Sequence, residues 1–205
     1  RGANEEQAKT LGFIGSAFTL SLMLMGILLV TQFNSFYQTF LVLSSVVMST
    51  VGVLLGLILT GQPFSAIMTG VGIVALAGII VNNNIVLIDT FNELRQSHPD
   101  WSLRQTATHT GCLRLRPVFL NTFTTGFGLL PMASGVSIDL IGRSVEVGGP
   151  IASFWMQLAS AIVSGLTFAT LLTLIVTPAM LALPEVLGEI RTRISGFSVR
   201  RLIRV

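Results

Sequence analysis

The stretch AGIIVNNNIVLID, residues 77–89, carries the strongest indication of both fold and function. Three consecutive asparagines and an aspartate stand in a segment whose other residues are all apolar or small. A polar side chain at membrane depth is costly unless it meets a partner or water, so such residues mark candidate functional sites. A second stretch, RLRPVFLNTFTT at 114–125, carries polar groups that match the first. Together the two stretches predict a polar seam between two membrane helices.

The composition indicates that lipid is the solvent for most of the chain. Hydrophobic residues make up 51% of the sequence and charged residues only 10%, and the mean hydropathy is +0.79. Soluble domains carry about 25% charged residues. One cysteine, Cys112, excludes an internal disulfide framework and a cysteine metal cluster. We expect an all-α fold, a polytopic transmembrane helix bundle, with no cofactor, no metal and no nucleic-acid partner.

A membrane-spanning helix needs about 20 mostly apolar residues. About five segments meet this requirement: 11–30, 40–60, 66–91, 117–134 and 151–183. Pro178 and Pro184 are expected to fray the end of the last segment, because proline removes a backbone donor and clashes one turn back. Residues 1–10 are polar and lack a signal-peptide pattern. The chain therefore reads as an internal or C-terminal piece of a longer protein.

The arginines predict the orientation in the membrane. A link at 92–116 separates the third and fourth spans, and a basic tail follows at 184–205. Cytosolic segments of membrane proteins are enriched in Lys and Arg, which places the link and the tail inside and residues 1–10 outside. The link is expected to hold a short helix at 101–111, with Asp100 as its N-cap.

Small residues recur at helical spacing in three of the predicted spans. In lipid, helices associate through close packing of small side chains. The three stripes therefore predict a tight bundle rather than five independent anchors. Their members are Ser45, Ser49, Gly52 and Gly56 in the second span, Gly70, Ala77 and Gly78 in the third, and Ala161, Gly165 and Ala169, with Ser160 and Ser164 beside them, in the fifth.

The amides suggest how the seam is arranged. Asn82 and Asp89 lie seven residues apart and share one face of a helix, while Asn83 turns to an adjacent face. In an antiparallel pair of helices, Asn121 would lie at a level between Asp89 and Asn82. That geometry permits interhelical hydrogen bonds worth roughly 0.6 to 2 kcal/mol each. The alternative is that these polar groups only hold the bundle together.

Several segments, in order, resemble the C-terminal transmembrane block of resistance–nodulation–division (RND) efflux transporters. They are TQFNSFY at 31–37, GIIVNNNIVLID at 78–89, RLRP at 114–117, GLLP at 128–131 and the apolar helix that ends in TP at 177–178. The resemblance covers about residues 12–183 and is nearest to the hydrophobe/amphiphile exporter branch. It implies that the five spans are helices eight to twelve, half of a pseudo-symmetric twelve-helix subunit.

The resemblance also implies proton-driven export. In this family a pair of aspartates on helix four faces a lysine on helix ten and polar groups on helix eleven. Matched by position, the lysine falls on Asn82, the polar partner falls near Asn121 with Thr122 beside it, and a nearby arginine falls on Arg114. Asparagine can donate and accept hydrogen bonds but cannot compensate a buried carboxylate by charge. The proton-relay candidates, listed together, are Asn82, Asn83, Asp89, Arg114, Asn121 and Thr122.

The family further implies a secondary active transporter rather than an enzyme, in the bacterial inner membrane with a cytoplasmic C-terminus. Its expected partners are the lipid bilayer, the remaining N-terminal part of the same subunit, two further copies in a homotrimer, a periplasmic adaptor protein and an outer-membrane channel. The fragment would supply part of the proton-relay helices of a multidrug antiporter and would not transport alone. The alternative is an RND-superfamily lipid exporter or protein-translocation accessory built on the same bundle.

Overall fold

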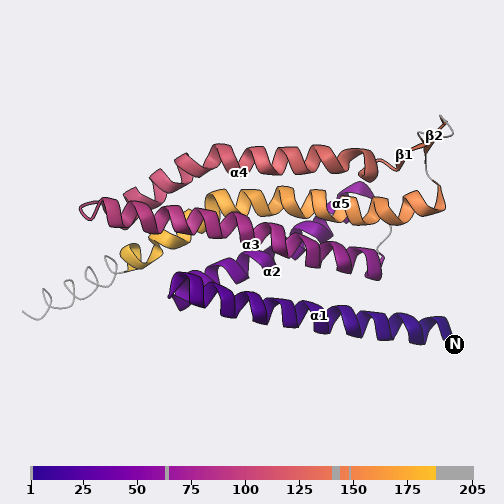
Figure 1. Ribbon diagram of the computed structural model, residues 1–205, viewed down its shortest axis with the longest axis horizontal. Helices are drawn as coiled ribbons and strands as arrows, with labels where there is room; N and C mark the ends of the chain where they lie inside the picture. Colours follow the sequence, from indigo (N-terminus) through magenta and orange to yellow (C-terminus); the bar gives the residue numbers. More distant parts are fainter. Residues whose placement is uncertain (1, 63–64, 140–143, 148, 188–205) are drawn as a thin grey trace, which may run out of the picture.

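The computed structural model describes residues 2–62, 65–139, 144–147 and 149–187. Five long α-helices run roughly side by side along the length of the molecule (Figure 1). They are α1 (Gly2–Phe33), α2 (Phe36–Thr60), α3 (Ala66–Ser97), α4 (Leu103–Ala133) and α5 (Pro150–Leu171). A π-helical segment, η1 (Leu172–Val176), continues α5, and a further α-helical stretch covers 177–187. The predicted all-α bundle is confirmed.

Local signals set several helix ends. Ser35 caps α2 by accepting a hydrogen bond from the Gln38 backbone N–H, and α2 ends at Gly61 in the left-handed conformation, φ 64°. At the start of α4, the Ser102 side chain accepts from the Gln105 backbone N–H while the Gln105 side chain accepts from the Ser102 backbone N–H. This reciprocal arrangement is a capping box. It makes Ser102 the N-cap of the helix, not Asp100 as expected.

The structure joins two elements that the sequence analysis separates. The helix expected in the link and the fourth span form one helix, α4, which passes through Pro117 and Pro131. Similarly, α3 extends to Ser97, beyond the expected span, and α1 includes most of the polar segment expected at 1–10. The basic tail lies mostly outside the described residues, as does Arg143.

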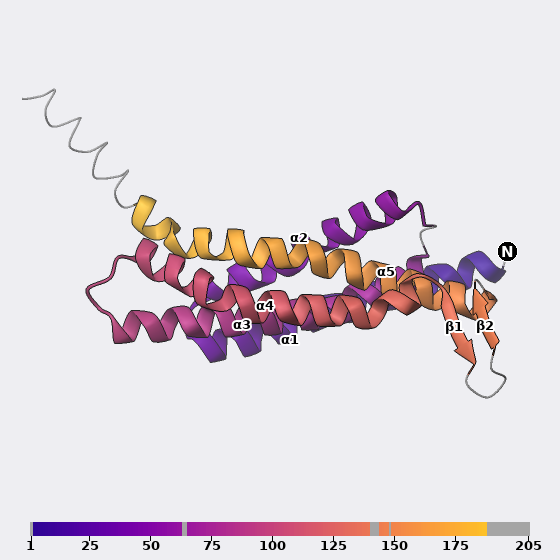
Figure 2. The same ribbon diagram turned by 90° about the horizontal axis from the view of Figure 1, so that it is seen from above.

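The connection between α4 and α5 contains a small β-hairpin that the sequence analysis does not anticipate. Strand β1 (Val136–Asp139) pairs antiparallel with β2 (Ser144–Val147), with Val136 opposite Val147 and Asp139 opposite Ser144. The hairpin lies at the end of the bundle that also holds the N-terminus (Figure 2). It adds a small element outside the helices and leaves the bundle all-α.

Among the residues that the structure describes, four helices are long and apolar enough to cross a membrane: Glu5–Phe33, Phe36–Thr60, Ala66–Ser97 and Ala152–Leu187. Helix α4 falls outside this group, although it lies alongside the others (Figure 1). Its polar residues, among them Asn121 and Thr122, lower its hydropathy, and both form hydrogen bonds to neighbouring helices.

Helix α5 packs against α2, α3 and α4, and α1 packs against α2 and α3. The small-residue stripes of α2 and α5 lie at these contacts, whereas a Cβ added to Gly78 of the α3 stripe would meet no described residue within 4 Å. A Cβ atom added to Gly56 would lie 2.0 Å from the Ser164 Cβ, and one added to Gly165 would lie 2.3 Å from Leu76 Cδ2. Helices α2, α3 and α5 therefore approach as closely as the stripes predict.

Candidate functional site

Helices α3 and α4 are joined by two hydrogen bonds between polar side chains. The Asn121 amide donates to the Asn83 Oδ1 at 3.0 Å, and the Arg114 Nε–H donates to the Thr90 Oγ1 at 2.5 Å. The two partners on each helix are seven residues apart, so the bonds form two rungs separated by about 10 Å along the helices. We call these two pairs the α3–α4 seam. It confirms that α3 and α4 are antiparallel neighbours with polar groups facing each other.

The partner of Asn121 differs from the arrangement expected from the sequence. Asn83, only 8% exposed, meets Asn121, whereas the Asn82 side chain is exposed on another face of α3. Axial levels can be counted from the sequence, but successive residues of a helix are rotated by about 100°, and the rotation of α3 depends on packing. Asn82 therefore lies outside the seam and faces away from the described bundle.

A third polar contact joins α4 to α5. The Thr122 and Thr170 hydroxyl oxygens are 2.6 Å apart. The Thr170 hydroxyl donates its one hydrogen to the Leu166 carbonyl at 2.7 Å. Since a hydroxyl has a single hydrogen, Thr122 is the donor and Thr170 the acceptor in this pair. Neighbouring residues of α4, Asn121 and Thr122, thus connect to α3 and α5 respectively.

Asn84, which the sequence analysis leaves out of the candidate site, is the most enclosed of the three asparagines. It is 0% exposed and contacts Ser45 of α2 and Thr177, which follows η1. The sequence held one indication of this: three consecutive amides cover too wide an arc for all of them to face α4. Thr90, Thr170 and Thr177 gave no such signal, because threonines that bond only within their own helix look the same in sequence.

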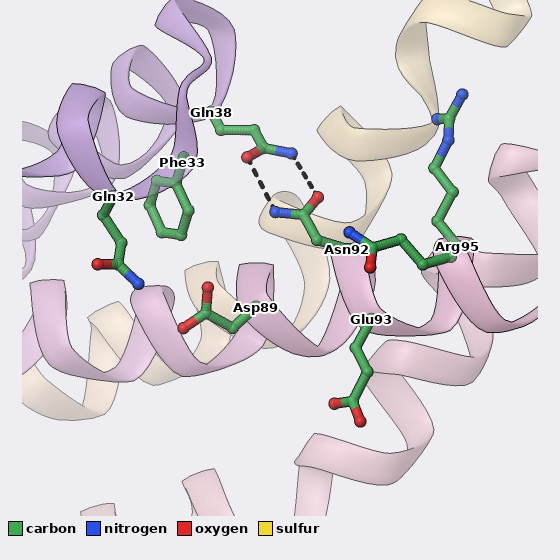
Figure 3. Close-up of a pocket in the computed structure, with 8 residues that line it drawn as sticks. Gln32, Phe33, Gln38, Asp89, Asn92, Glu93 and Arg95 are labelled. Atoms are coloured by element: carbon green, nitrogen blue, oxygen red, sulfur yellow. Dashed lines mark hydrogen bonds between the residues drawn. The ribbon is translucent and has the colours of Figure 1, made fainter.

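Asp89 lines an open cavity at the end of the bundle where α1 ends and α2 begins. The cavity has a volume of about 710 Å³ and is lined by Gln32, Phe33, Gln38, Asp89, Asn92, Glu93, Arg95 and Gln96. Gln38 and Asn92 pair through two hydrogen bonds, of 2.8 and 3.2 Å. Figure 3 shows the Asp89 carboxylate on the Gln32 side of α3, whereas Glu93 extends to the side opposite the amide pair. Asp89 shares the exposed face of α3 with Asn82.

Within the described part of the chain, His, Cys, Asp and Glu do not gather into any group of three or more that would hold a metal ion. The polar groups that do gather are amides, hydroxyls and one guanidinium. These groups exchange and orient hydrogen bonds. The arrangement holds α3, α4 and α5 together through hydrogen bonds that can reorient when a neighbouring charge changes.

The model of the AcrB/AcrD/AcrF family matches residues 1–185. The chain belongs to this family. The resemblance to RND transporters is thereby confirmed, and the class expected from it, a secondary transporter, agrees with the family. Family membership alone does not distinguish exporters of hydrophobic compounds from exporters of metals.

Individual relatives come from both groups. The chain is 29% identical to the swarming motility protein SwrC of Bacillus subtilis over 195 residues, 95% of this chain and 17% of that protein. It is 31% identical to the cobalt-zinc-cadmium resistance protein CzcA of Cupriavidus metallidurans, covering 78% of this chain and 14% of CzcA. It is also 31% identical to the multidrug resistance protein MdtC of Erwinia tasmaniensis, covering 86% and 15%.

The fold is similar to a crystal structure of a heavy metal efflux pump, with a TM-score of 0.71 and 28% sequence identity over 89% of this chain and 16% of that one. The chain thus spans about one sixth of the length of the proteins it matches. The family and the long apolar helices together indicate that this chain is part of a multi-pass membrane protein.

Proposed function

We propose that this chain is part of a proton-driven antiporter that exports compounds across the bacterial inner membrane, and that the α3–α4 seam belongs to its proton-responsive region. The observation that carries the proposal is the pair of rungs, Asn83 with Asn121 and Thr90 with Arg114. Interhelical side-chain hydrogen bonds of this kind are worth roughly 0.6 to 2 kcal/mol each, so a change of charge nearby is large enough to rearrange them.

Asn82 is the residue proposed to face the proton-carrying group. It lies on the exposed face of α3, with Asp89 two turns away on the same face. That face is where the remaining helices of the subunit would pack. An asparagine there supplies hydrogen bonds without charge. Buried carboxylates opposite it would be compensated less than by a lysine, and desolvation would favour their protonated form.

The membrane potential and the pH gradient can supply the energy. One charge moving through 100 mV yields about 2.3 kcal/mol, and each pH unit adds about 1.4 kcal/mol per proton. One proton can therefore support a substrate gradient of more than tenfold. The seam offers hydrogen-bonding groups but no Asp, Glu or His of its own, so the group that carries the proton would lie on another helix.

The proposed orientation places the α3–α4 connection and the C-terminus in the cytoplasm. Arg95, Arg104, Arg114 and Arg116 flank this connection, which supports the assignment by the positive-inside rule. The hairpin and the N-terminal end of α1 would then face the periplasm. There the full subunit would form a homotrimer and meet a periplasmic adaptor protein and an outer-membrane channel.

We propose hydrophobic or amphiphilic compounds as the substrates. The similarity to MdtC supports this class. Heavy-metal cations are the second candidate, favoured by the similarity to CzcA and to the heavy metal efflux pump. The described residues hold amides rather than a carboxylate or methionine path along the seam, which favours the first class.

The test is to express the full reading frame that encodes this chain in an efflux-deficient host. Resistance to a panel of amphiphilic drugs, lost on adding an uncoupler, is the expected result. Resistance to cobalt, zinc or cadmium alone would assign the metal class instead. Drug export that persists with an uncoupler and stops on ATP depletion would contradict proton drive. Asn82→Ala should abolish export with the oligomer intact, whereas normal export by that variant would remove Asn82 from the relay.

A further inference from the structure

The three asparagines of α3 make its rotation ambiguous. Asn82, Asn83 and Asn84 have the same side chain and point in directions about 100° apart. A rotation of α3 by one residue would present Asn84 to Asn121 in place of Asn83, with the same chemical groups. The Asn83–Asn121 bond by itself therefore does not determine which amide faces α4.

Asn84 opposes this rotation, because Ile85 would then take its place beside Ser45 and Thr177 and has no polar group to offer them. The Asn84 amide nitrogen donates to the Ser45 Oγ at 2.9 Å and to the Ile80 carbonyl at 3.1 Å. Its Oδ1 accepts from the Thr177 hydroxyl at 3.1 Å. The Ser45 hydroxyl hydrogen is directed to the Val42 carbonyl, at 2.7 Å, so Ser45 can only accept from Asn84. Every hydrogen of this fully buried amide thus has a partner.

The π-helical segment η1 turns Thr177 towards Asn84. The Thr177 backbone N–H bonds to the Leu172 carbonyl, five residues back, where an α-helix would use the fourth. One extra residue in a turn rotates the following side chains by about 100° relative to an uninterrupted helix. Pro178 follows directly and has no backbone N–H to donate to Leu174. The irregular turn therefore directs the Thr177 hydroxyl towards Asn84 of α3.

We propose that Asn84 is a positioning residue that sets the rotation of α3, with Ser45 and Thr177 as its fixed partners. It acts through its neighbours: it holds Asn83 against Asn121 and keeps Asn82 on the outer face of α3. A single buried polar residue that fixes the register of packed helices is known from coiled coils. The meaning of this rotation for transport rests on the proposed function; the rotation itself does not.

Two reporter positions on α3 distinguish rotation from general loosening. Leu87 is 0% exposed and its neighbour Val86 is 37% exposed. If Asn84 takes the place of Asn83, each side chain of α3 takes the direction of the residue before it. Leu87 then points outward, as Val86 does now, and Val86 points in the half-buried direction of Ile85. Rotation therefore raises the accessibility of one position and lowers that of the other. A loosened bundle would raise both.

The experiment measures the reaction of Leu87→Cys and Val86→Cys with a maleimide in this 205-residue chain with Cys112→Ala, purified in detergent, where the rest of the subunit does not cover the outer face of α3; the helical circular-dichroism spectrum of each variant is checked first. Thr177→Val removes one of the two interhelical bonds of Asn84 and should make Leu87→Cys react about threefold faster. Thr177→Val combined with Ser45→Ala removes both, leaves Asn84 itself free to meet Asn121, and should give about tenfold. In each variant Val86→Cys should react more slowly.

Two controls complete the design. Thr167→Val is the matched control, because the Thr167 hydroxyl bonds only to Val163 in its own helix, and it should change neither rate. Thr177→Ser keeps the hydroxyl and should restore the parent rates. Equal rises at both reporter positions, no change in either variant, or failure of Thr177→Ser to restore the rates would overturn the proposal. These results involve no transport, so they stand apart from failure of the proposed function.

Discussion

A close approach between α2 and α5 gives a prediction whose size follows from the structure. Gly56 of α2 faces Ser164 of α5, and an added Cβ would lie 2.0 Å from the Ser164 Cβ, 2.3 Å from its Oγ and 3.4 Å from its Cα. Carbon atoms in contact are separated by about 3.5–4.0 Å. Gly56→Ala therefore requires the two helices to separate locally by about 1.5 Å, given that the clash is with a Cβ that cannot rotate away.

Overpacking of this kind costs roughly 1–3 kcal/mol. We expect the upper part of that range, because the separation also weakens the neighbouring contact of Gly52 with Phe168, where an added Cβ would lie 2.4 Å from the Phe168 Cβ. Gly78→Ala is the matched control. A Cβ at Gly78 meets nothing within 4 Å, so this substitution keeps only the gain in helix propensity, up to about 1 kcal/mol.

The assay is unfolding of this 205-residue chain in detergent, where the rest of the subunit does not cover Gly78, followed by circular dichroism as a denaturing detergent is added. Gly56→Ala should lower the midpoint and Gly78→Ala should not. Adding Ser164→Gly to Gly56→Ala removes the opposing Cβ and should recover at least half of the loss. Equal stability of the Gly56→Ala and Gly78→Ala proteins, or no recovery in the double variant, would refute the close approach of α2 and α5.

Two further predictions concern the end of the bundle formed by residues 177–187. Tyr37→Phe should lower stability by about 1 kcal/mol in the same unfolding assay. The Tyr37 hydroxyl donates to the Met180 carbonyl at 2.5 Å, and Pro184 leaves this carbonyl without a donor in its own helix. An unchanged midpoint would show that another group donates to this carbonyl. Glu185→Gln should lower the stability by about 0.3–1 kcal/mol at low salt and by less at high salt. The Glu185 carboxylate accepts a hydrogen bond of 3.0 Å from the Arg104 backbone N–H in the first turn of α4, where a negative charge is stabilising. A loss of stability that does not depend on salt would contradict a charge effect.

The course of the helices was predictable from the sequence because composition and length decide whether a segment spans a membrane. The stripes of small residues likewise predict the helix contacts around Gly56 and Gly165 from the sequence alone. Both features depend on one helix at a time, or on the simple rule that small side chains allow close approach. The two rungs of the seam could be predicted in part. The levels of residues along two antiparallel helices can be counted from the sequence, whereas the faces that meet cannot.

Rotation and irregular turns were harder to predict. Asn83 rather than Asn82 meets Asn121 because contacts with α2 and with residue 177 set the angle of α3. Pro178 and Pro184 were expected to fray the last helix, but helical structure continues to residue 187. A π-helical turn accommodates the first proline, and a tyrosine from α2 satisfies the carbonyl freed by the second. Such compensation comes from other helices and leaves no local pattern in the sequence.

We propose that Asn83 and Asn121 act as one unit in proton-coupled export. The most direct measurement is the export rate driven by an imposed pH gradient in proteoliposomes that contain the full-length protein, for Asn83→Ala, Asn121→Ala and the double variant. We predict that each single substitution removes most of the gradient-driven rate and that the double variant is no slower than the slower single one, since groups that act as a unit are strongly non-additive. Parent rates in both single variants, or losses that multiply in the double variant, would contradict the account.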